Sequence, residues 1–123
     1  MRKIKFRVWC KEHSEWESNP TFIADNGALF CGLARSAIPL KDNTHVVMQY
    51  TGLKDKNGTE IYEGDVVKVK IEMIGMRILG KVVFQEAMFC CITPILPNDS
   101  IPLYGADEIE VIGNIYQNPE LLE

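Results

Sequence analysis

Short segments in which apolar and charged residues alternate recur along this chain of 123 residues, with glycine-containing turns between them. Residues 3–8 alternate between basic and apolar side chains, and residues 67–73 alternate between charged and apolar side chains. A period of two residues is typical of a β-strand with one buried face. No segment shows the longer period of an amphipathic helix. The chain is therefore expected to fold mainly into β-strands.

Turn signals indicate where these strands end. Asp25-Asn26-Gly27 and Asn57-Gly58 each suit a hairpin, because Asn and Gly tolerate positive φ, so Gly58→Val is expected to lower stability. Gly75 permits another turn, and Gly80 is a candidate β-bulge. Asn118-Pro119 predicts a single helical turn near the C-terminus. Further strands are predicted at residues 21–24, 29–33, 45–50, 78–84, 88–93 and 109–116, with a turn at 97–99 and a break in the last strand at Gly113.

Strands at this spacing favour a small barrel or a sandwich, in a mainly β protein with short N-terminal strands and a hairpin. The alternative is an α+β fold with an N-terminal subdomain. The length fits one domain over residues 1–123. Within it, an N-terminal subdomain at 1–44 and a barrel portion at 45–123 are conceivable, although composition does not mark the boundary.

Composition limits the class of protein. The net charge of −4 does not favour a large nucleic-acid footprint, although a local basic patch is compatible with it. No run approaches the roughly 20 apolar residues of a membrane helix, so we expect no membrane partner. The N-terminus does not resemble a secretion signal. We therefore expect a cytoplasmic protein whose four cysteines are reduced thiols.

Three blocks of the sequence carry a resemblance to a known family. They are IKFRVW at 4–9, MQYTGLKDKNGTEIYEGDVV at 48–67 and IEVIGNIYQNPELL at 109–122. In this order they resemble the YopX family, small proteins of bacteriophages and prophages. The resemblance implies phage origin and a compact, largely β fold with an SH3-like barrel portion. It implies no catalytic residue, cofactor or activity, and Cys10 stands where the family typically has aspartate after the tryptophan.

The second block contains a candidate protein-binding loop made of Tyr50, Lys54 and Tyr62, since ordered loops often carry recognition. The alternative is that this stretch serves folding. In that case its glycines permit turn dihedrals, Ile61 and one tyrosine anchor the hairpin, and Asp65 accepts backbone N–H bonds. We favour the folding role.

Neither metal binding nor catalysis has a convincing motif. Asp55 could begin a calcium loop, but Gly58 then falls at position four and not at position six. Cys10 and His13 have the spacing of a zinc-ligand pair, which Cys31 or His45 could extend, but a second closely spaced pair is absent. Nucleophile elbows and phosphate-binding loops are also absent. We expect no catalytic residue, no metal and no cofactor.

Basic strand faces are the best charge-based indication of function. A row of basic side chains that ends in Trp9 on the first strand, and two lysines on a later strand, form a candidate surface for phosphates and stacked bases. The alternative is that these residues protect exposed strands from pairing with other chains. The candidate nucleic-acid-binding residues are Arg2, Lys3, Lys5, Arg7, Trp9, Lys68 and Lys70.

The function that we favour from sequence is that of a non-catalytic phage or prophage accessory protein, acting as a protein-binding or adaptor module. Its partner would be a host or phage protein, or a second copy of the chain. The alternative is a nucleic-acid-binding accessory protein that uses the basic strand faces. An enzyme is the least favoured alternative, because it would need a concave pocket with converging ionisable groups.

Overall fold

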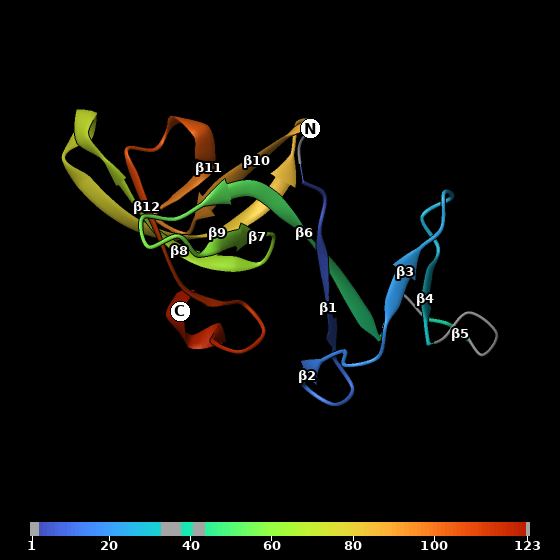
Figure 1. Cartoon of the computed structure of the whole chain (residues 1–123). Coiled ribbons are helices and arrows are strands. Elements are labelled where there is room, and N and C mark those ends of the chain that lie inside the picture. The colour runs from blue at the N-terminus through green and yellow to red at the C-terminus, as the bar shows by residue number, and fades with distance from the viewer. Residues whose placement is uncertain (1–2, 33–37, 41–43, 123) are drawn as a thin grey trace. The chain divides into compact units, whose positions relative to one another are not determined.

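The computed structural model describes residues 3–32, 38–40 and 44–122. The chain divides into two compact units. We call Phe6–Met48 the N-terminal unit, and we call Met1–Lys5 together with Gln49–Glu123 the barrel unit. Both consist mainly of strands, as the alternating pattern predicted (Figure 1). Among the described residues, none of the helices reaches the length and apolar character needed to cross a membrane.

The described part of the N-terminal unit contains short antiparallel strands. A hairpin turn with Gly27 at φ 89° links the strands at Thr21–Ile23 and Leu29–Cys31, as the Asp25-Asn26-Gly27 signal predicted. The strands β1 (Phe6–Cys10) and β2 (Glu15–Trp16) pair with each other, and β3 (Thr21–Ile23), β4 (Leu29–Cys31) and β5 (Ile38–Pro39) form a sheet in that order. The long strand β6 (His45–Lys54) begins in this unit and ends in the barrel unit.

A five-stranded antiparallel sheet dominates the barrel unit. Its order is β11-β10-β9-β8-β12, and it curls into a half-barrel (Figure 1). The mainly β fold with a small barrel portion is thus confirmed, while the SH3-like detail stays a prediction. The strands are β8 (Asp65–Ile71), β9 (Met76–Gln85), β10 (Met88–Thr93), β11 (Leu96–Pro102) and β12 (Glu108–Asn114). The short 3₁₀ helix η1 (Glu72–Ile74) links β8 to β9, and η2 (Leu103–Gly105) links β11 to β12. β7 (Glu60–Tyr62) precedes β8 and pairs with β6, and the 3₁₀ helix η3 (Pro119–Leu122) follows β12.

One face of this sheet carries the hydrophobic core. Alternate residues of β8, β9 and β10 point into it, because side chains in a strand project to opposite faces in turn. The fully covered core residues include Val67, Val69, Ile78, Val82 and Cys91, each at most 2% exposed. Their sequence neighbours Val66, Lys81 and Ile92 therefore belong to the opposite face of the sheet.

The first strand differs from its predicted pattern. Ile4 and Phe6 were expected to be buried, but they are 58% and 46% exposed, whereas Trp9 is only 5% exposed. The Trp9 ring packs edge-on against Trp16 at 5.0 Å, while Val8 and Cys10 are 6% and 4% exposed, so both faces of the strand are covered from Val8 to Cys10. The prediction of Trp9 on an exposed basic face is therefore wrong.

Other local predictions also need correction. Gly80 is not a bulge, because the pairing of β9 with both neighbours runs without a register shift. A register shift does occur between Val111 and Gly113, in the pairing of β12 with β8, where the sequence predicted a break in the last strand. Residues 97–99 belong to β11 and do not form a separate turn. The strand from Val67 ends at Ile71, and Met73 on η1 is 95% exposed.

Candidate binding pocket

The residues of the candidate protein-binding loop differ in burial. Tyr50 is buried, and its ring lies 5.5 Å from that of Tyr62 across the pairing of β6 with β7. Lys5 Nζ lies 5.9 Å from the centre of the Tyr50 ring. Lys54, in contrast, is exposed. The structure therefore brings the two tyrosines together inside the barrel unit and leaves Lys54 at the surface.

The folding role expected for this stretch is confirmed. Gly52, Gly58 and Gly64 have φ of 88°, 84° and 83°, which favour glycine. Ile61 is completely buried, and Asp65 accepts a hydrogen bond of 2.8 Å from the Tyr62 N–H.

Asp55 organises the same hairpin. Its Oδ1 accepts the N–H groups of Asn57 at 2.8 Å and Thr59 at 2.9 Å, and its Oδ2 accepts that of Val111 at 2.9 Å. Burial alone would raise the pKa of this carboxyl, but the three backbone N–H groups outweigh it and lower the pKa below its ordinary value. Asp55 thus ties the hairpin to β12 and is not placed as a calcium ligand.

The basic residues of the N-terminal segment fall in different units and mostly have partners. Arg2 lies outside the described residues. Lys3 is exposed, and Lys5 forms an ion pair of 2.9 Å with Glu60, which raises the pKa of Lys5 and lowers that of Glu60. In the N-terminal unit the Arg7 guanidinium lies 4.7 Å from the centre of the Trp16 ring. With Trp9 buried, these residues do not form one exposed row.

The second basic stripe is balanced by acids on the neighbouring strand. Lys68 is paired directly with Glu110, and Lys70 with Glu108, in the register of β8 with β12. Lys70 also forms an ion pair of 3.5 Å with Glu72. Opposite charges at facing positions stabilise an antiparallel pair of strands, so this stripe has a structural explanation.

The cysteine and histidine residues considered for zinc line one hollow of about 300 Å³ in the N-terminal unit. Cys10, His13, Cys31 and His45 all contribute to it. His45 Nε2 lies 3.2 Å from a carboxylate oxygen of Glu17, so that ring is already engaged. Across residues 3–32, 38–40 and 44–122, no three His, Cys, Asp or Glu side chains are grouped so as to hold a metal ion.

The thiols are poorly suited to nucleophilic chemistry. All four cysteines are free and buried. Burial raises the pKa of Cys91 to about 12, and burial also raises the pKa values of Cys31 and Cys90. The thiolate is the reactive form, and the raised pKa values keep Cys31, Cys90 and Cys91 protonated near neutral pH.

The barrel unit contains a larger pocket, of about 550 Å³, that sequence reasoning missed. It lies on the face of the five-stranded sheet opposite the core. Val66 on β8, Lys81 on β9, Ile92 on β10 and Ser100 on β11 are successive cross-strand partners. All four line the pocket, so one row of facing positions across the sheet forms part of its wall.

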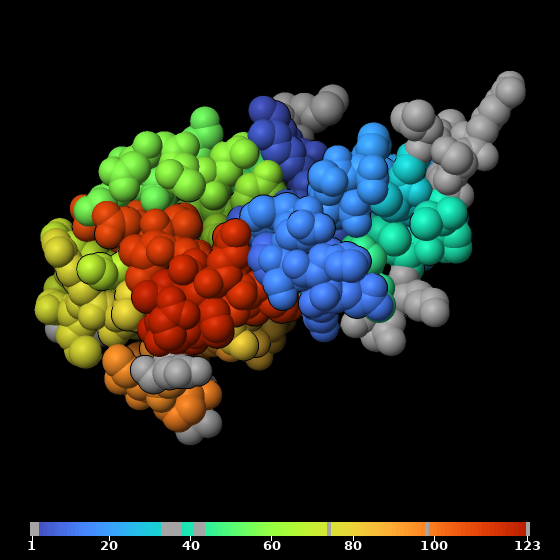
Figure 2. Space-filling view, turned by 90° about the horizontal axis from the view of Figure 1, so that it is seen from below, coloured from blue at the N-terminus to red at the C-terminus, as the bar shows by residue number. Residues whose placement is uncertain are grey.

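The C-terminal segment closes one side of this pocket. Beyond β12 the chain turns back, held by Asn114, whose side-chain oxygen accepts the N–H groups of Tyr116 at 3.0 Å and Gln117 at 2.8 Å. Ile115, Asn118 and Leu122 then line the pocket. Figure 2 shows the C-terminal residues, in red, on the surface of the molecule.

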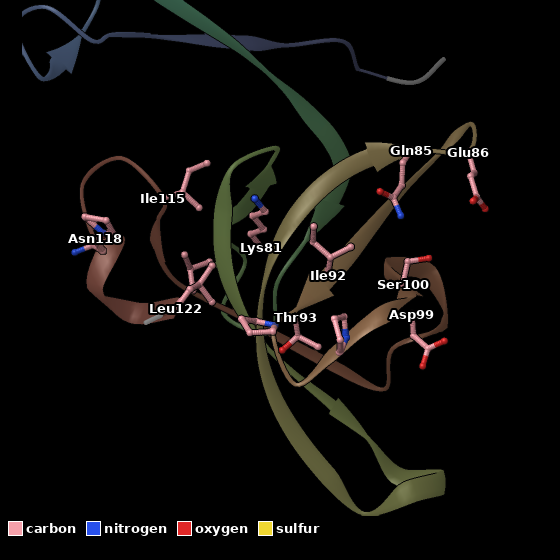
Figure 3. A pocket seen from close by; sticks show the side chains of 14 residues that line it. Lys81, Gln85, Glu86, Ile92, Thr93, Asp99, Ser100, Ile115, Asn118 and Leu122 are labelled. Atoms are coloured by element: carbon pink, nitrogen blue, oxygen red, sulfur yellow. The ribbon is translucent and has the colours of Figure 1, made fainter.

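The pocket combines an apolar wall with separated charges. Figure 3 shows Lys81 between Ile92 on one side and the C-terminal residues Ile115 and Leu122 on the other. The acids Glu86 and Asp99 lie beyond Ile92, near Gln85 and Ser100 (Figure 3). Lys81 is half-buried, whereas both acids are exposed. The pocket therefore has a cationic centre and an acidic rim on one side.

One signal in the sequence marked this site. Lys81 is the charged residue within the otherwise apolar run from Ile78 to Phe84. A charge at that point indicates that this face of the strand is not closed by the core. The other walls come from strands and a C-terminal turn distant in sequence, and no motif connects them.

Comparisons with known proteins place the chain in context. A family model described as YopX protein matches residues 5–123. The chain is similar to the crystal structure of protein yopX from Bacillus subtilis, with 26% identity, full coverage of both chains and a TM-score of 0.65. It is also similar to protein EF1440 from Enterococcus faecalis, with 26% identity, full coverage of both chains and a TM-score of 0.62. No curated protein matches the chain.

Proposed function

The chain belongs to the YopX family, and we propose that it acts as a non-catalytic phage or prophage accessory protein that binds another protein. It works in the cytoplasm of the bacterial host, as a protein-binding or adaptor module. The observation that carries this proposal is the pocket of about 550 Å³ in the barrel unit, with its apolar wall and few, separated charges. Recognition sites commonly combine a mainly apolar lining with a small number of polar groups that fix orientation.

The same pocket is a poor match for an enzyme. Within the described part of the chain, no hydrogen bond or ion pair joins its ionisable groups Lys81, Glu86 and Asp99. General acid–base chemistry needs groups that converge on one reacting atom with matched pKa values. The separation of the cation from the two acids favours binding over catalysis.

The nucleic-acid alternative has weaker support. Lys5, Lys68 and Lys70 each face a glutamate, through an ion pair or a cross-strand pairing. A phosphate backbone would have to displace these carboxylates or bind beside them. Together with the net charge of −4, this favours a protein partner over nucleic acid.

An affinity capture from host lysate, with and without nuclease, tests the proposal. We expect a specific protein that stays bound after nuclease treatment and at moderate salt. The purified partner should bind the purified chain with a defined stoichiometry, and it should bind the Ile92→Thr variant more weakly, because that change removes apolar area from the pocket. Capture of nucleic acid alone, or only of proteins lost on nuclease treatment, would favour the alternative and overturn the proposal.

A further inference from the structure

Lys81 occupies an unusual place for a lysine. It lies on the middle strand of the five-stranded sheet, and its two cross-strand neighbours are the apolar residues Val66 and Ile92. Val66 is completely buried, and Lys81 and Ile92 are half-buried. The ammonium group is therefore held beside an apolar surface, where water screens a charge less than at an open surface.

Several other lysines of the barrel unit have a carboxylate at close range, although Lys68 has only a cross-strand glutamate. Lys5 pairs with Glu60 at 2.9 Å, Lys56 with Glu110 at 3.3 Å and Lys70 with Glu72 at 3.5 Å. Within the described part of the chain, none of the ion pairs includes Lys81. A half-buried lysine that has no ion pair among the described residues is well suited to bind an anionic group of a ligand.

The two acids that share the pocket restrict the kind of anion. Glu86 and Asp99 lie beyond Ile92 from Lys81 (Figure 3). They would repel a ligand that carries many negative charges, such as a phosphate backbone, and attract a cationic group. A ligand that carries one anionic and one cationic group, with apolar atoms between them, matches this charge distribution.

The sheet also offers a place for an extended chain. β11 is the terminal strand of the five-stranded order, and its residues Asp99 and Ser100 line the pocket. The pocket thus runs across the face of the sheet from β8 to this last strand, which gives an extended segment room to cross it. This arrangement favours a polypeptide over a small metabolite.

We propose that the pocket binds an extended segment of the partner protein, in which an Asp or Glu side chain pairs with Lys81 and a Lys or Arg side chain faces Glu86 and Asp99. Apolar side chains between the two charges contact Ile92 and Leu122. This inference rests on the proposed protein-binding function, and it names the chemistry that the partner must present.

Selection from a surface-displayed library of linear ten-residue peptides against the purified full chain tests the inference. The selected peptides should share an acidic and a basic residue separated by apolar residues. A synthetic peptide with this consensus should bind Lys81→Met about tenfold more weakly than the unchanged chain, since Met keeps the length of the stem and removes the charge. Lys68→Met, the matched control on β8, should bind within about twofold of the unchanged chain.

The peptide provides the second side of the test. Replacing its acidic residue by the amide should weaken binding by the same factor, and this change should add little once Lys81 is already Met, because the two groups form one pair. Lys81→Arg should retain most of the binding. If Lys81→Met fails to fold, the peptide with the amide and the Lys81→Arg variant still test whether Lys81 pairs with the acidic residue of the peptide.

Several outcomes would overturn the inference. They are the absence of any selected peptide, selected peptides that lack an acid, and equal binding to Lys81→Met and the unchanged chain. If a partner protein captured from lysate binds both forms equally, the protein-binding function stands and only the role of Lys81 fails. If an oligonucleotide competes with the peptide for the pocket, the ligand class is wrong.

Discussion

At the scale of single residues, Asp55 is the clearest example of a charged group that serves the fold. It is 8% exposed and accepts three backbone N–H groups, two within its own hairpin and one from β12. A buried carboxylate is stable only when such donors replace the water that it has lost.

Asp55→Asn should lower the free energy of unfolding at neutral pH by about 2 kcal/mol, because the amide presents N–H groups to backbone donors. The folded pKa of Asp55 is lower than its ordinary value of 3.8. Its contribution is therefore present above that value and lost as the pH falls through the folded pKa. Denaturant titrations at several pH values should show a shallower acid loss in the variant. Asp25→Asn, at an exposed position, should change stability by less than about 0.5 kcal/mol. Equal acid profiles for Asp55→Asn and the unchanged chain would contradict this role.

Gly58 shows a backbone requirement in the same hairpin. Its φ is 84°, and a Cβ added there would meet no atom within 4 Å, so only the dihedral angle opposes a side chain. Gly58→Ala should cost about 1 to 2 kcal/mol. Gly105→Ala is the control, because Gly105 has equally open space without a positive φ. Thermal melts that show the same midpoint for both variants would disprove the requirement.

At the scale of secondary-structure elements, β9 depends on Gly80 for close approach to β10. A Cβ at Gly80 would collide with Cys91 Sγ and with the carbonyl oxygen of Ile92. The backbone atom cannot move without shifting the strand, so a side chain at this position must distort the sheet.

Gly80→Ala should therefore lower the free energy of unfolding by about 3 kcal/mol, more than Gly58→Ala. Measured against Cys91→Ala alone, the Gly80→Ala change should cost less than it does in the unchanged chain, because one of the two collisions is then absent. Chemical denaturation of these variants and Gly105→Ala checks this. A loss below about 0.5 kcal/mol in Gly80→Ala would show that the sheet adapts.

Sequence reasoning succeeded for elements with strong local signals. The alternation in residues 67–71 predicted β8, and Asn57-Gly58 and Asp25-Asn26-Gly27 predicted hairpin turns that the structure contains. It failed for β11, because Pro97-Asn98-Asp99 reads locally as a turn, whereas the flanking residues Leu96 and Ser100 pair with β10 and the strand runs through. It also misread the first strand, since the burial of Trp9 depends on Trp16 and not on the local period.

The pocket was missed for a related reason. Its row of facing residues is created by the pairing of four strands, and register between strands cannot be read from one strand alone. Tyr50 and Tyr62 illustrate the converse case. Their position in a patterned loop suggested a surface, but the pairing of β6 with β7 places their rings together inside the barrel unit.

At the scale of the whole molecule, charge is mostly balanced between neighbours. Glutamates face Lys5, Lys68 and Lys70. Lys81, in contrast, lies in the pocket, apart from these three lysines. A protein with net charge −4 and paired surface lysines is expected to bind DNA or RNA weakly and with a steep loss on adding salt. The function is then more reasonably sought in the pocket than on the basic strand faces.

The most direct measurement is amide chemical-shift mapping of the full chain as the purified partner is added. We expect the largest shifts on the pocket row and the C-terminal turn, namely at Lys81, Ile92, Ser100 and Leu122. Shifts centred on Lys3, Lys54 and Lys68, with the pocket row unchanged, would contradict the central claim that the pocket of the barrel unit binds the partner.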